Sequence, residues 1–220
     1  MARTVLHIGA HKTATTWLQH NFHANIAALD RAGWYYPQTG VRVRVAHHDL
    51  SDNPDEILDP ASAKVREFRR IVARADEKNI LLSSEGFRNW GPEHLKALQA
   101  LVVPHAMHIV YCLRDPAAVF YSFWAQQIRT GSKNSFPEFR EKQFSRPKRS
   151  KILNPLADVR MLTGLEGATV TLLLYDEIVR QKRDIFDVFV EDILHLPRLP
   201  HSEDARGNDR QPLEMTEFMR

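Results

Sequence analysis

The chain of 220 residues is poor in cysteine, in long apolar runs and in net charge. Its one cysteine, Cys112, excludes an internal disulfide and suits a reducing compartment. No stretch is long and apolar enough to span a bilayer. The residues before the first apolar run include Arg3 and lack the hydrophobic core of a signal peptide. We therefore expect a cytoplasmic protein with no membrane span, in which Cys112 is a small buried residue and not a nucleophile.

The net charge of +3 at pH 7 is too small for a protein that binds nucleic acid through a generally positive surface, and no nucleic-acid partner is expected. The positive charge is nevertheless uneven, because one segment gathers six cations against a single Glu141. These cations are Arg140, Lys142, Arg146, Lys148, Arg149 and Lys151. A solvated, mobile loop is the favoured interpretation of this run. The alternative is an electrostatic funnel for an anionic cofactor or substrate.

Segments with the periodicity of strands alternate along the chain with segments that have the periodicity of helices. Strands are expected over residues 4–9, 79–84, 107–113 and 170–175, the first two of them buried. Helices are expected over residues 17–29, 64–75, 92–102, 117–129 and 183–194. This alternation predicts a three-layer α/β/α fold with a mostly parallel central sheet. The length suits one core, so we expect residues 1–220 to form a single domain.

Ligands of parallel sheets bind outside the carboxyl ends of the strands. In the predicted fold this edge holds Lys12, Glu85, Arg114 and the pair Tyr175-Asp176. The sequence therefore predicts that these side chains share one rim.

The most informative segment is residues 5–18, where an apolar strand runs through a turn of small residues into a helix. The N–H groups of such a turn and of the first helical turn point at one spot, and the helix dipole favours negative charge there. Lys12 adds a mobile cation to this spot. Hydroxyl donors come from Thr13, Thr15 and Thr16. The segment therefore predicts a site for a phosphate-like anion.

The same loop does not fit the P-loop of nucleotide hydrolases, which requires G-x-x-x-x-G-K-[ST]. Gly9 is followed by Lys12 after only two residues, and Ala14 stands where a second glycine would be sought. The alternative to an anion site is an amphipathic helix capped by Thr15 or Thr16, with Lys12 as a solvated charge. The loop alone gives the two interpretations equal weight.

A second strand-to-helix junction carries an arginine and a serine eight positions apart. The strand ends at Arg114-Asp115-Pro116, and Ser122 lies in the helix that follows. Arg114 can bind a phosphate with two N–H groups at once. Ser122, on the same face of the helix, can donate a hydrogen bond from its hydroxyl to the same group. The structural alternatives are an ion pair between Arg114 and Asp115 and a bond from Ser122 to its own backbone.

Together the two junctions resemble the PAPS-dependent sulfotransferases, most closely in their bacterial form. His11-Lys12-Thr13-Ala14-Thr15-Thr16-Trp17-Leu18 is similar to the loop that binds the 5′-phosphosulfate of PAPS (3′-phosphoadenosine 5′-phosphosulfate). The segment from Arg114 to Ser122 is similar to the 3′-phosphate motif. The resemblance implies a P-loop nucleotide hydrolase-like sulfotransferase fold, PAPS as co-substrate and no metal. The cofactor contacts that it implies are His11, Lys12, Thr13, Ala14, Thr15, Thr16, Arg114 and Ser122.

The resemblance extends in layout from residue 4 to about residue 195. Residues 172–178 are similar to a strand of the family that is followed by Tyr-Glu-Asp-Leu, here with the two acids exchanged. We interpret these residues as mainly architectural. Residues 206–210 loosely resemble a late basic loop that closes over the cofactor. Because the family usually continues beyond such a loop, the chain is expected to be a compact member or an incomplete one.

The resemblance implies in-line transfer of a sulfuryl group from PAPS to a hydroxyl or amine of a small-molecule, glycan or lipid acceptor. Lys12 would stabilise the charge that builds on the oxygen between sulfur and the 5′-phosphate. The acceptor needs a general base. Glu85, directly after the second strand, is the first candidate, and an ion pair with Arg88 is its structural alternative. His48 and His47 are the next candidates as base.

Two other classes of protein stay open. A nucleotide kinase or other phosphotransferase would need a Walker-type lysine and a magnesium-holding aspartate, which the first strand, loop and helix do not provide. A non-catalytic nucleotide-binding protein on the same scaffold is the second. Several aromatic residues suit a sugar, a phenol or a lipid-linked acceptor equally, namely Trp34, Tyr35, Tyr36, Phe123 and Trp124. No oligomeric state is predicted.

Overall fold

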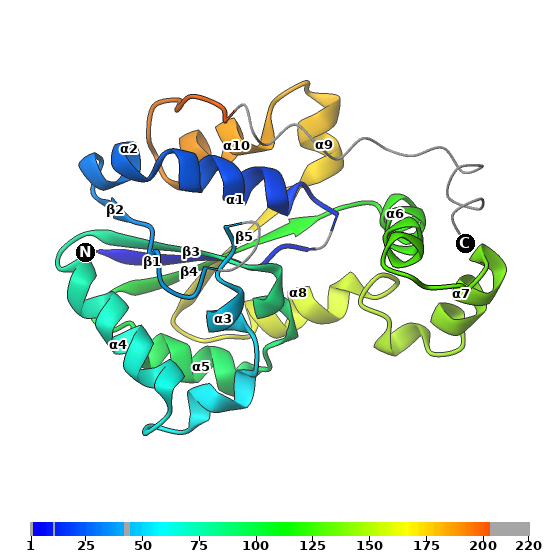
Figure 1. Ribbon diagram of the computed structural model, residues 1–220, viewed down its shortest axis with the longest axis horizontal. Coiled ribbons are helices and arrows are strands. Elements are labelled where there is room, and N and C mark those ends of the chain that lie inside the picture. Colours follow the sequence, from blue (N-terminus) through cyan, green and yellow to red (C-terminus); the bar gives the residue numbers. More distant parts are fainter. Residues whose placement is uncertain (1, 11, 42–44, 203–220) are drawn as a thin grey trace.

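The computed structural model describes residues 2–10, 12–41 and 45–202. Five strands form one sheet in the order β2-β3-β1-β4-β5 (Figure 1). Every neighbouring pair of strands is parallel, which confirms the predicted α/β class with a parallel central sheet. The strands are β1 (Arg3–His7), β2 (Trp34–Tyr35), β3 (Asn79–Ser83), β4 (Ala106–Leu113) and β5 (Ala168–Leu174).

Helices cover both faces of the sheet, as predicted (Figure 1). One face carries α1 (Thr15–Ala24), α2 (Ile26–Arg31), α9 (Tyr175–Arg180), α10 (Ile185–Val188) and the π-helical turn η4 (Phe189–Ile193). The other face carries α3 (His48–Ser51), α4 (Ala63–Ala75), α5 (Pro92–Leu101) and α8 (Pro155–Thr163), with the 3-10 turns η1 (Pro54–Leu58) and η2 (Glu85–Asn89). The elements α6 (Pro116–Arg129), α7 (Phe136–Phe144) and η3 (Pro147–Arg149) stand beyond the carboxyl ends of the strands.

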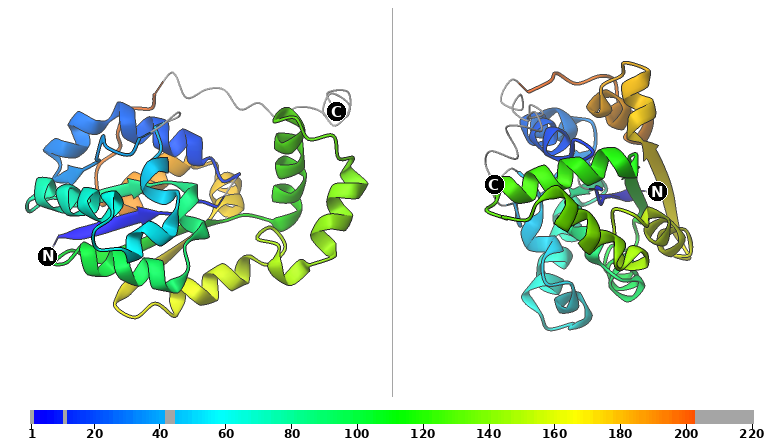
Figure 2. Two further views of the ribbon diagram at one scale, coloured as in Figure 1. Left: turned by 60° about the horizontal axis from the view of Figure 1, so that its bottom comes forward. Right: turned by 90° about the vertical axis from the view of Figure 1, so that its right-hand side faces the viewer.

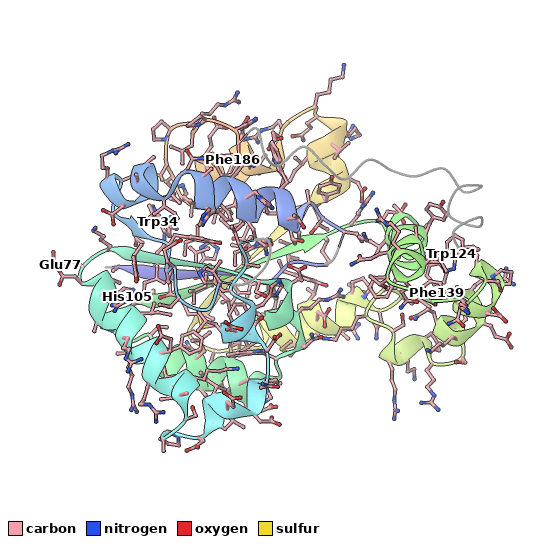
Figure 3. The ribbon with its side chains drawn as sticks, in the orientation of Figure 1. Trp34, Glu77, His105, Trp124, Phe139 and Phe186 are labelled. Carbon is pink, nitrogen blue, oxygen red and sulfur yellow. The ribbon has the colours of Figure 1, made fainter. Side chains whose placement is uncertain are left out.

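The hydrophobic core lies on both faces of the sheet. Val5 in β1 packs into a cluster with Phe22 and Phe186 on the α1 face, while the next residue, Leu6, packs into a cluster with Phe68 on the α4 face. Phe186 lies on the α1 side of the sheet (Figure 3). Because the central strands β1, β3 and β4 are covered on both faces, they are nearly continuous apolar runs, and this explains why they could be recognised in the sequence. In β5, at the edge of the sheet, only Leu173 is buried.

Two of the predicted helices differ from the structure where a polar side chain bonds to the backbone. The predicted helix over residues 17–29 is broken at Asn25, whose side-chain amide donates to the carbonyls of Asn21 and Pro200, both at 2.9 Å. The predicted helix over residues 183–194 starts only after Asp184, whose carboxylate accepts from the N–H of Phe186 at 2.7 Å. Both cases are local competition between side-chain and helical hydrogen bonds.

The basic run was expected to be a solvated, mobile loop; its six cations are exposed, but much of the run is helical, so the expectation of a loop is wrong. Residues 136–144 form α7, which begins with a capping box between Ser135 and Glu138. We call residues 116–153 the α6–α7 lobe (Figure 2). Trp124 and Phe139 lie inside it (Figure 3). The lobe has a small core of its own, made of Val119, Phe120, Trp124, Ala125, Ile128, Phe139 and Ile152.

Cys112 lies fully buried in β4, as predicted for a packing residue. Burial raises the pKa of its thiol to about 12, which makes it a poor nucleophile at neutral pH. Within the stretches that the structure describes, none of the helices combines the length and the apolar character that crossing a membrane requires.

Candidate active site

The loop between β1 and α1 has the backbone geometry of an anion site. Three of its residues have a positive φ, namely Gly9 at 86°, Lys12 at 69° and Ala14 at 57°. Left-handed residues among right-handed ones make successive N–H groups converge on one concave spot. α1 begins directly after Ala14, so the N–H groups of its first turn, which have no acceptor within the helix, face the same end. Ala14 adopts the conformation that a glycine usually supplies, which explains how the loop forms without a second glycine.

The three threonines Thr13, Thr15 and Thr16 differ in their burial and hydrogen bonding. Thr13 is buried, and its hydroxyl donates to the carbonyl of Ala10 at 2.6 Å. Its side chain therefore stabilises the loop, and an anion would meet residue 13 only through its backbone. Thr15 is buried and Thr16 is half-buried in the first turn of α1. Ala14 is the N-cap residue, so the alternative in which Thr15 or Thr16 caps the helix is wrong. His11 lies outside the described residues.

Arg114 connects the two predicted anion motifs. It follows β4, which pairs directly with β1, and its Nη1 donates to the carbonyl of Lys12. Its side chain is only 9% exposed, and its Nε is buried without a hydrogen-bond partner. A buried guanidinium N–H without an acceptor is costly, so this group is suited to a ligand that carries an oxygen. The structure therefore brings Lys12 and Arg114 to the same rim.

Tyr175 and Asp176 hold Arg114 from the side of β5. The guanidinium carbon lies 5.1 Å from the centre of the Tyr175 ring, and Nε lies 3.8 Å from Oδ1 of Asp176. Oδ2 of Asp176 accepts from the N–H of Asp115 at 2.5 Å. Asp115 itself caps α6 by accepting from the N–H of Ala117, so the carboxylate beside Arg114 is Asp176 and not Asp115 as the ion-pair alternative supposed. From the sequence, Tyr175 and Asp176 were interpreted as mainly architectural.

Ser122 lies half-buried on α6, the helix that begins two residues after Arg114. Its place after the Arg114 junction follows the order read from the sequence. Its contact with a phosphate stays a prediction.

Glu85 begins η2, directly after β3 and Ser84, at the same edge as the loop. One of its carboxylate oxygens, Oε2, accepts from the side-chain amide of Gln19 on α1 at 3.2 Å. Beside it, His7 is completely buried, and burial lowers the pKa of His7 to about 4, while the charge of Glu85 acts in the opposite direction. Glu85 is thus a carboxylate positioned between β1, β3 and α1.

The two adjacent histidines have different surroundings. His47 is buried, with Nδ1 accepting from the N–H of Ser83 at 3.1 Å and Nε2 donating to the carbonyl of Pro37 at 2.9 Å. Burial lowers the pKa of His47 to about 4, and both of its ring nitrogens bond to backbone, so it supports the fold at this edge. His48 is half-buried, and its Nδ1 lies 3.3 Å from the hydroxyl of Ser84, next to Glu85. Of the pair, His48 is the more accessible side chain.

Arg88 forms its ion pair with Asp158 of α8. The structural alternative to a catalytic Glu85 had been an ion pair between Glu85 and Arg88. Nε of Arg88 donates to Oδ2 of Asp158 at 2.7 Å, and Tyr111 donates to the same oxygen at 3.0 Å. Arg88 also donates to the carbonyl of Lys151, while Nζ of Lys151 donates to the carbonyl of Arg88 at 2.5 Å. This buried network fixes η2, the turn that begins with Glu85, against α8 and the base of the α6–α7 lobe.

A groove of about 280 Å³ lies beside the loop, between α1, α9 and α10. Its wall includes Ala14 and two aromatic side chains, Trp17 and Tyr175. The indole N–H of Trp17 donates to Asp184 at 3.0 Å, which fixes the orientation of the ring. Trp17 belongs to the segment that resembles the phosphosulfate loop, and Tyr175 was predicted at the rim, but neither was predicted to contact a ligand. Among the described residues, no group of three or more histidine, cysteine, aspartate or glutamate side chains could hold a metal.

We call the loop between β1 and α1 the anion loop. This loop and Arg114, which follows the neighbouring β4, define an α/β protein with a P-loop-like fold. A family model described as the sulfotransferase domain matches residues 2–181, and the chain belongs to this family. No curated protein sequence matches the chain.

Two solved structures have a similar fold. One is a sulfotransferase from Alicyclobacillus acidocaldarius, which is 14% identical with a TM-score of 0.58, over 100% of this chain and 92% of that chain. The other is the sulfotransferase domain from the curacin biosynthetic pathway, which is 12% identical with a TM-score of 0.52, over 99% of this chain and 83% of that chain. At this level of identity the two structures support the fold.

Proposed function

We propose that the chain, as a single domain, transfers the sulfuryl group of PAPS to a hydroxyl or amine of an acceptor. The observation that carries this proposal is the contact between Arg114 and the carbonyl of Lys12, because it joins the two anion motifs into one site. A donor with phosphates at both its 3′ and 5′ positions requires two anion sites at a fixed separation. The buried Nε of Arg114, which has no hydrogen-bond partner, supports a ligand with phosphate oxygens.

In this proposal the loop holds the phosphosulfate end of the donor. Converging N–H groups of the loop and of the first turn of α1 bind the 5′-phosphate, with the hydroxyls of Thr15 and Thr16 beside them. Arg114 and Ser122 bind the 3′-phosphate. The groove beside Ala14 suits the purine ring, because Trp17 and Tyr175 give it two aromatic walls next to the loop.

The reaction follows from these positions. The acceptor oxygen or nitrogen forms a bond to sulfur, and the bond between sulfur and the 5′-phosphate oxygen breaks in line with it. The electron pair leaves on that phosphate oxygen, and Lys12 stabilises the charge. The acceptor proton passes to Glu85, with His48 as the second candidate base. Glu85 is preferred because it is a carboxylate held at the rim by Gln19.

The experiment is a transfer assay with PAPS labelled in the sulfuryl group, applied to a panel of sugars, phenols and lipids. We expect Lys12→Ala to lower kcat about a thousandfold, which is typical for the loss of a group that stabilises transition-state charge. Glu85→Gln should lower kcat further than His48→Gln. PAP (3′-phosphoadenosine 5′-phosphate, the donor without its sulfuryl group) should raise the melting temperature of the protein, and ATP with magnesium should not. Full activity of the Lys12→Ala variant, or stabilisation by ATP alone, would overturn the proposal.

A further inference from the structure

The α6–α7 lobe has an excess of exposed positive charge that the proposed reaction does not use. Between residues 129 and 149, seven lysine and arginine residues are exposed, and only two glutamates lie in the same stretch. The seven are Arg129, Lys133, Arg140, Lys142, Arg146, Lys148 and Arg149. This excess of five positive charges is larger than the +3 of the whole chain, so the rest of the protein is slightly negative.

Two glutamates, Glu138 and Glu141, stand against the seven cations of this stretch. The carboxylate of Glu138 accepts from the N–H and the hydroxyl of Ser135, at 2.7 and 2.8 Å, at the start of α7. Among the residues that the structure describes, none of the seven cations forms a salt bridge with a carboxylate. All seven side chains are exposed, so a partner in solution can reach them.

The helices that carry these cations pack on a hydrophobic core. The rings of Phe120 and Phe139 lie 4.8 Å apart, and the indole N–H of Trp124 donates to the carbonyl of Asn134 at 2.9 Å. The reciprocal bonds between Arg88 and Lys151 then fix the base of the lobe to η2, which begins with Glu85. Figures 1 and 2 show the lobe beyond the carboxyl ends of the strands, at the edge where the anion loop lies.

We propose that the α6–α7 lobe binds a polyanionic glycan, a saccharide chain that carries carboxylate or sulfate groups, and that this chain is the acceptor. The proposal rests on the proposed function, because it names the acceptor class of that reaction. The seven cations are distributed from the end of α6 through α7 to η3, so a chain with repeated charges can meet more of them than a small anion, which would meet one or two. Phe144, which is 58% exposed, offers an aromatic face to a sugar ring.

The packing of α7 favours a glycan over a membrane surface. A helix that lies on a lipid surface turns its apolar face outward into the lipid. In α7 the apolar residues Phe136 and Phe139 pack into the core of the lobe, and the exposed residues Arg140, Glu141 and Lys142 are all charged. The acceptor must also offer hydroxyl or amino groups, which a saccharide chain has on every unit.

The test is a titration of a fluorescently labelled heparin oligosaccharide into the full chain, read by anisotropy at two salt concentrations and without PAPS. The lobe variant is Lys142→Gln, Arg146→Gln and Arg149→Gln combined. The matched control removes the same charges from exposed positions on α4 and α5, with Arg69→Gln, Arg74→Gln and Lys96→Gln combined. We expect the lobe variant to bind at least about tenfold more weakly with a smaller salt dependence, and the control to change less than about twofold.

Unchanged affinity for PAP in the lobe variant shows that its active site is folded. Equal weakening in both triple variants, or equal binding of neutral dextran, would overturn the proposal. So would tighter lobe-dependent binding of single-stranded RNA or of vesicles with anionic lipid. The assay contains no PAPS, so it does not depend on turnover. Lobe-dependent heparin binding in a chain without sulfuryl transfer would overturn the proposed function and the acceptor role of the glycan, and would leave only the glycan-binding surface.

Discussion

The anion loop and the α6–α7 lobe both present positive charge at one edge of the sheet, and they hold it in different ways. In the loop the charge comes from backbone N–H groups, Lys12 and the buried Arg114, whose Nη1 bonds to the loop itself. In the lobe the charge comes from exposed side chains over a small aromatic core. The loop can therefore select a ligand by geometry, whereas the lobe can only attract it by charge that salt screens.

The largest expected effect concerns the independence of the lobe. Phe139→Ala empties the centre of its core, and we expect a local loss of about 3–5 kcal/mol in stability. Hydrogen exchange should accelerate in α6 and α7 while the amides of β1 and β4 keep their protection, because the lobe has a separate hydrophobic cluster. The control is Phe144→Ala, at an exposed ring of the same helix. Equal acceleration throughout the sheet would show that the lobe and the sheet unfold as one unit.

The second prediction separates the two regions by pH. Residues 116–153 of the lobe contain no histidine, whereas His7 and His47 are buried at the sheet edge with pKa values lowered to about 4. Each stays neutral in the folded chain but takes up a proton in the unfolded chain below pH 6.5, so stability is full above pH 6.5 and falls as the pH drops toward 4. We expect a loss of about 3 kcal/mol for each, measured by urea unfolding.

A matched pair of variants checks this prediction. His47→Asn should flatten the decline of the free energy of unfolding between pH 6.5 and 4, whereas His23→Asn, at an exposed position at the end of α1, should leave the slope unchanged. An identical slope in wild type and His47→Asn would contradict the assignment.

The third prediction tests the geometric selectivity of the loop. Arg114→Ala removes the guanidinium that joins the two anion motifs, and we expect PAP to bind about a hundredfold more weakly. Calorimetric titration measures this directly. Because the ligand contact is buried, the loss should persist at high salt, unlike the effect of the lobe variant on heparin binding. A loss that salt abolishes would place Arg114 in the same class as the lobe cations.

The smallest effect is expected at Asp176, which we regard as a positioning residue. Asp176→Asn retains the size of the side chain but removes the charge beside Arg114, so PAP affinity should fall about tenfold with kcat little changed. Glu177→Gln is the control, since Glu177 is next along α9 and pairs instead with Arg180. If both variants bind PAP equally well, Asp176 serves only the fold.

The sequence predicted the parallel sheet, both flanking helix layers and the two junctions at Lys12 and Arg114. These features are local, because each follows from the periodicity of a short segment or from residues within one turn. The alternatives that stayed open concerned partners far apart in the chain. Arg88 pairs with Asp158, 70 positions away, and Arg114 reaches the carbonyl of Lys12, 102 positions away.

The basic run shows most plainly that partners far apart in the chain could not be predicted from the sequence. Its charges suggested a mobile loop, because the aromatic residues that anchor it are interspersed among cations and belong partly to the preceding helix. Phe139 is buried where it packs against Phe120 and Phe123 of α6. The sequence by itself therefore determined the sheet and the anion loop, whose signals are local. Only the tertiary structure decided what surrounds Arg114 and how the lobe is fixed, because burial and pairing depend on which distant segments pack together.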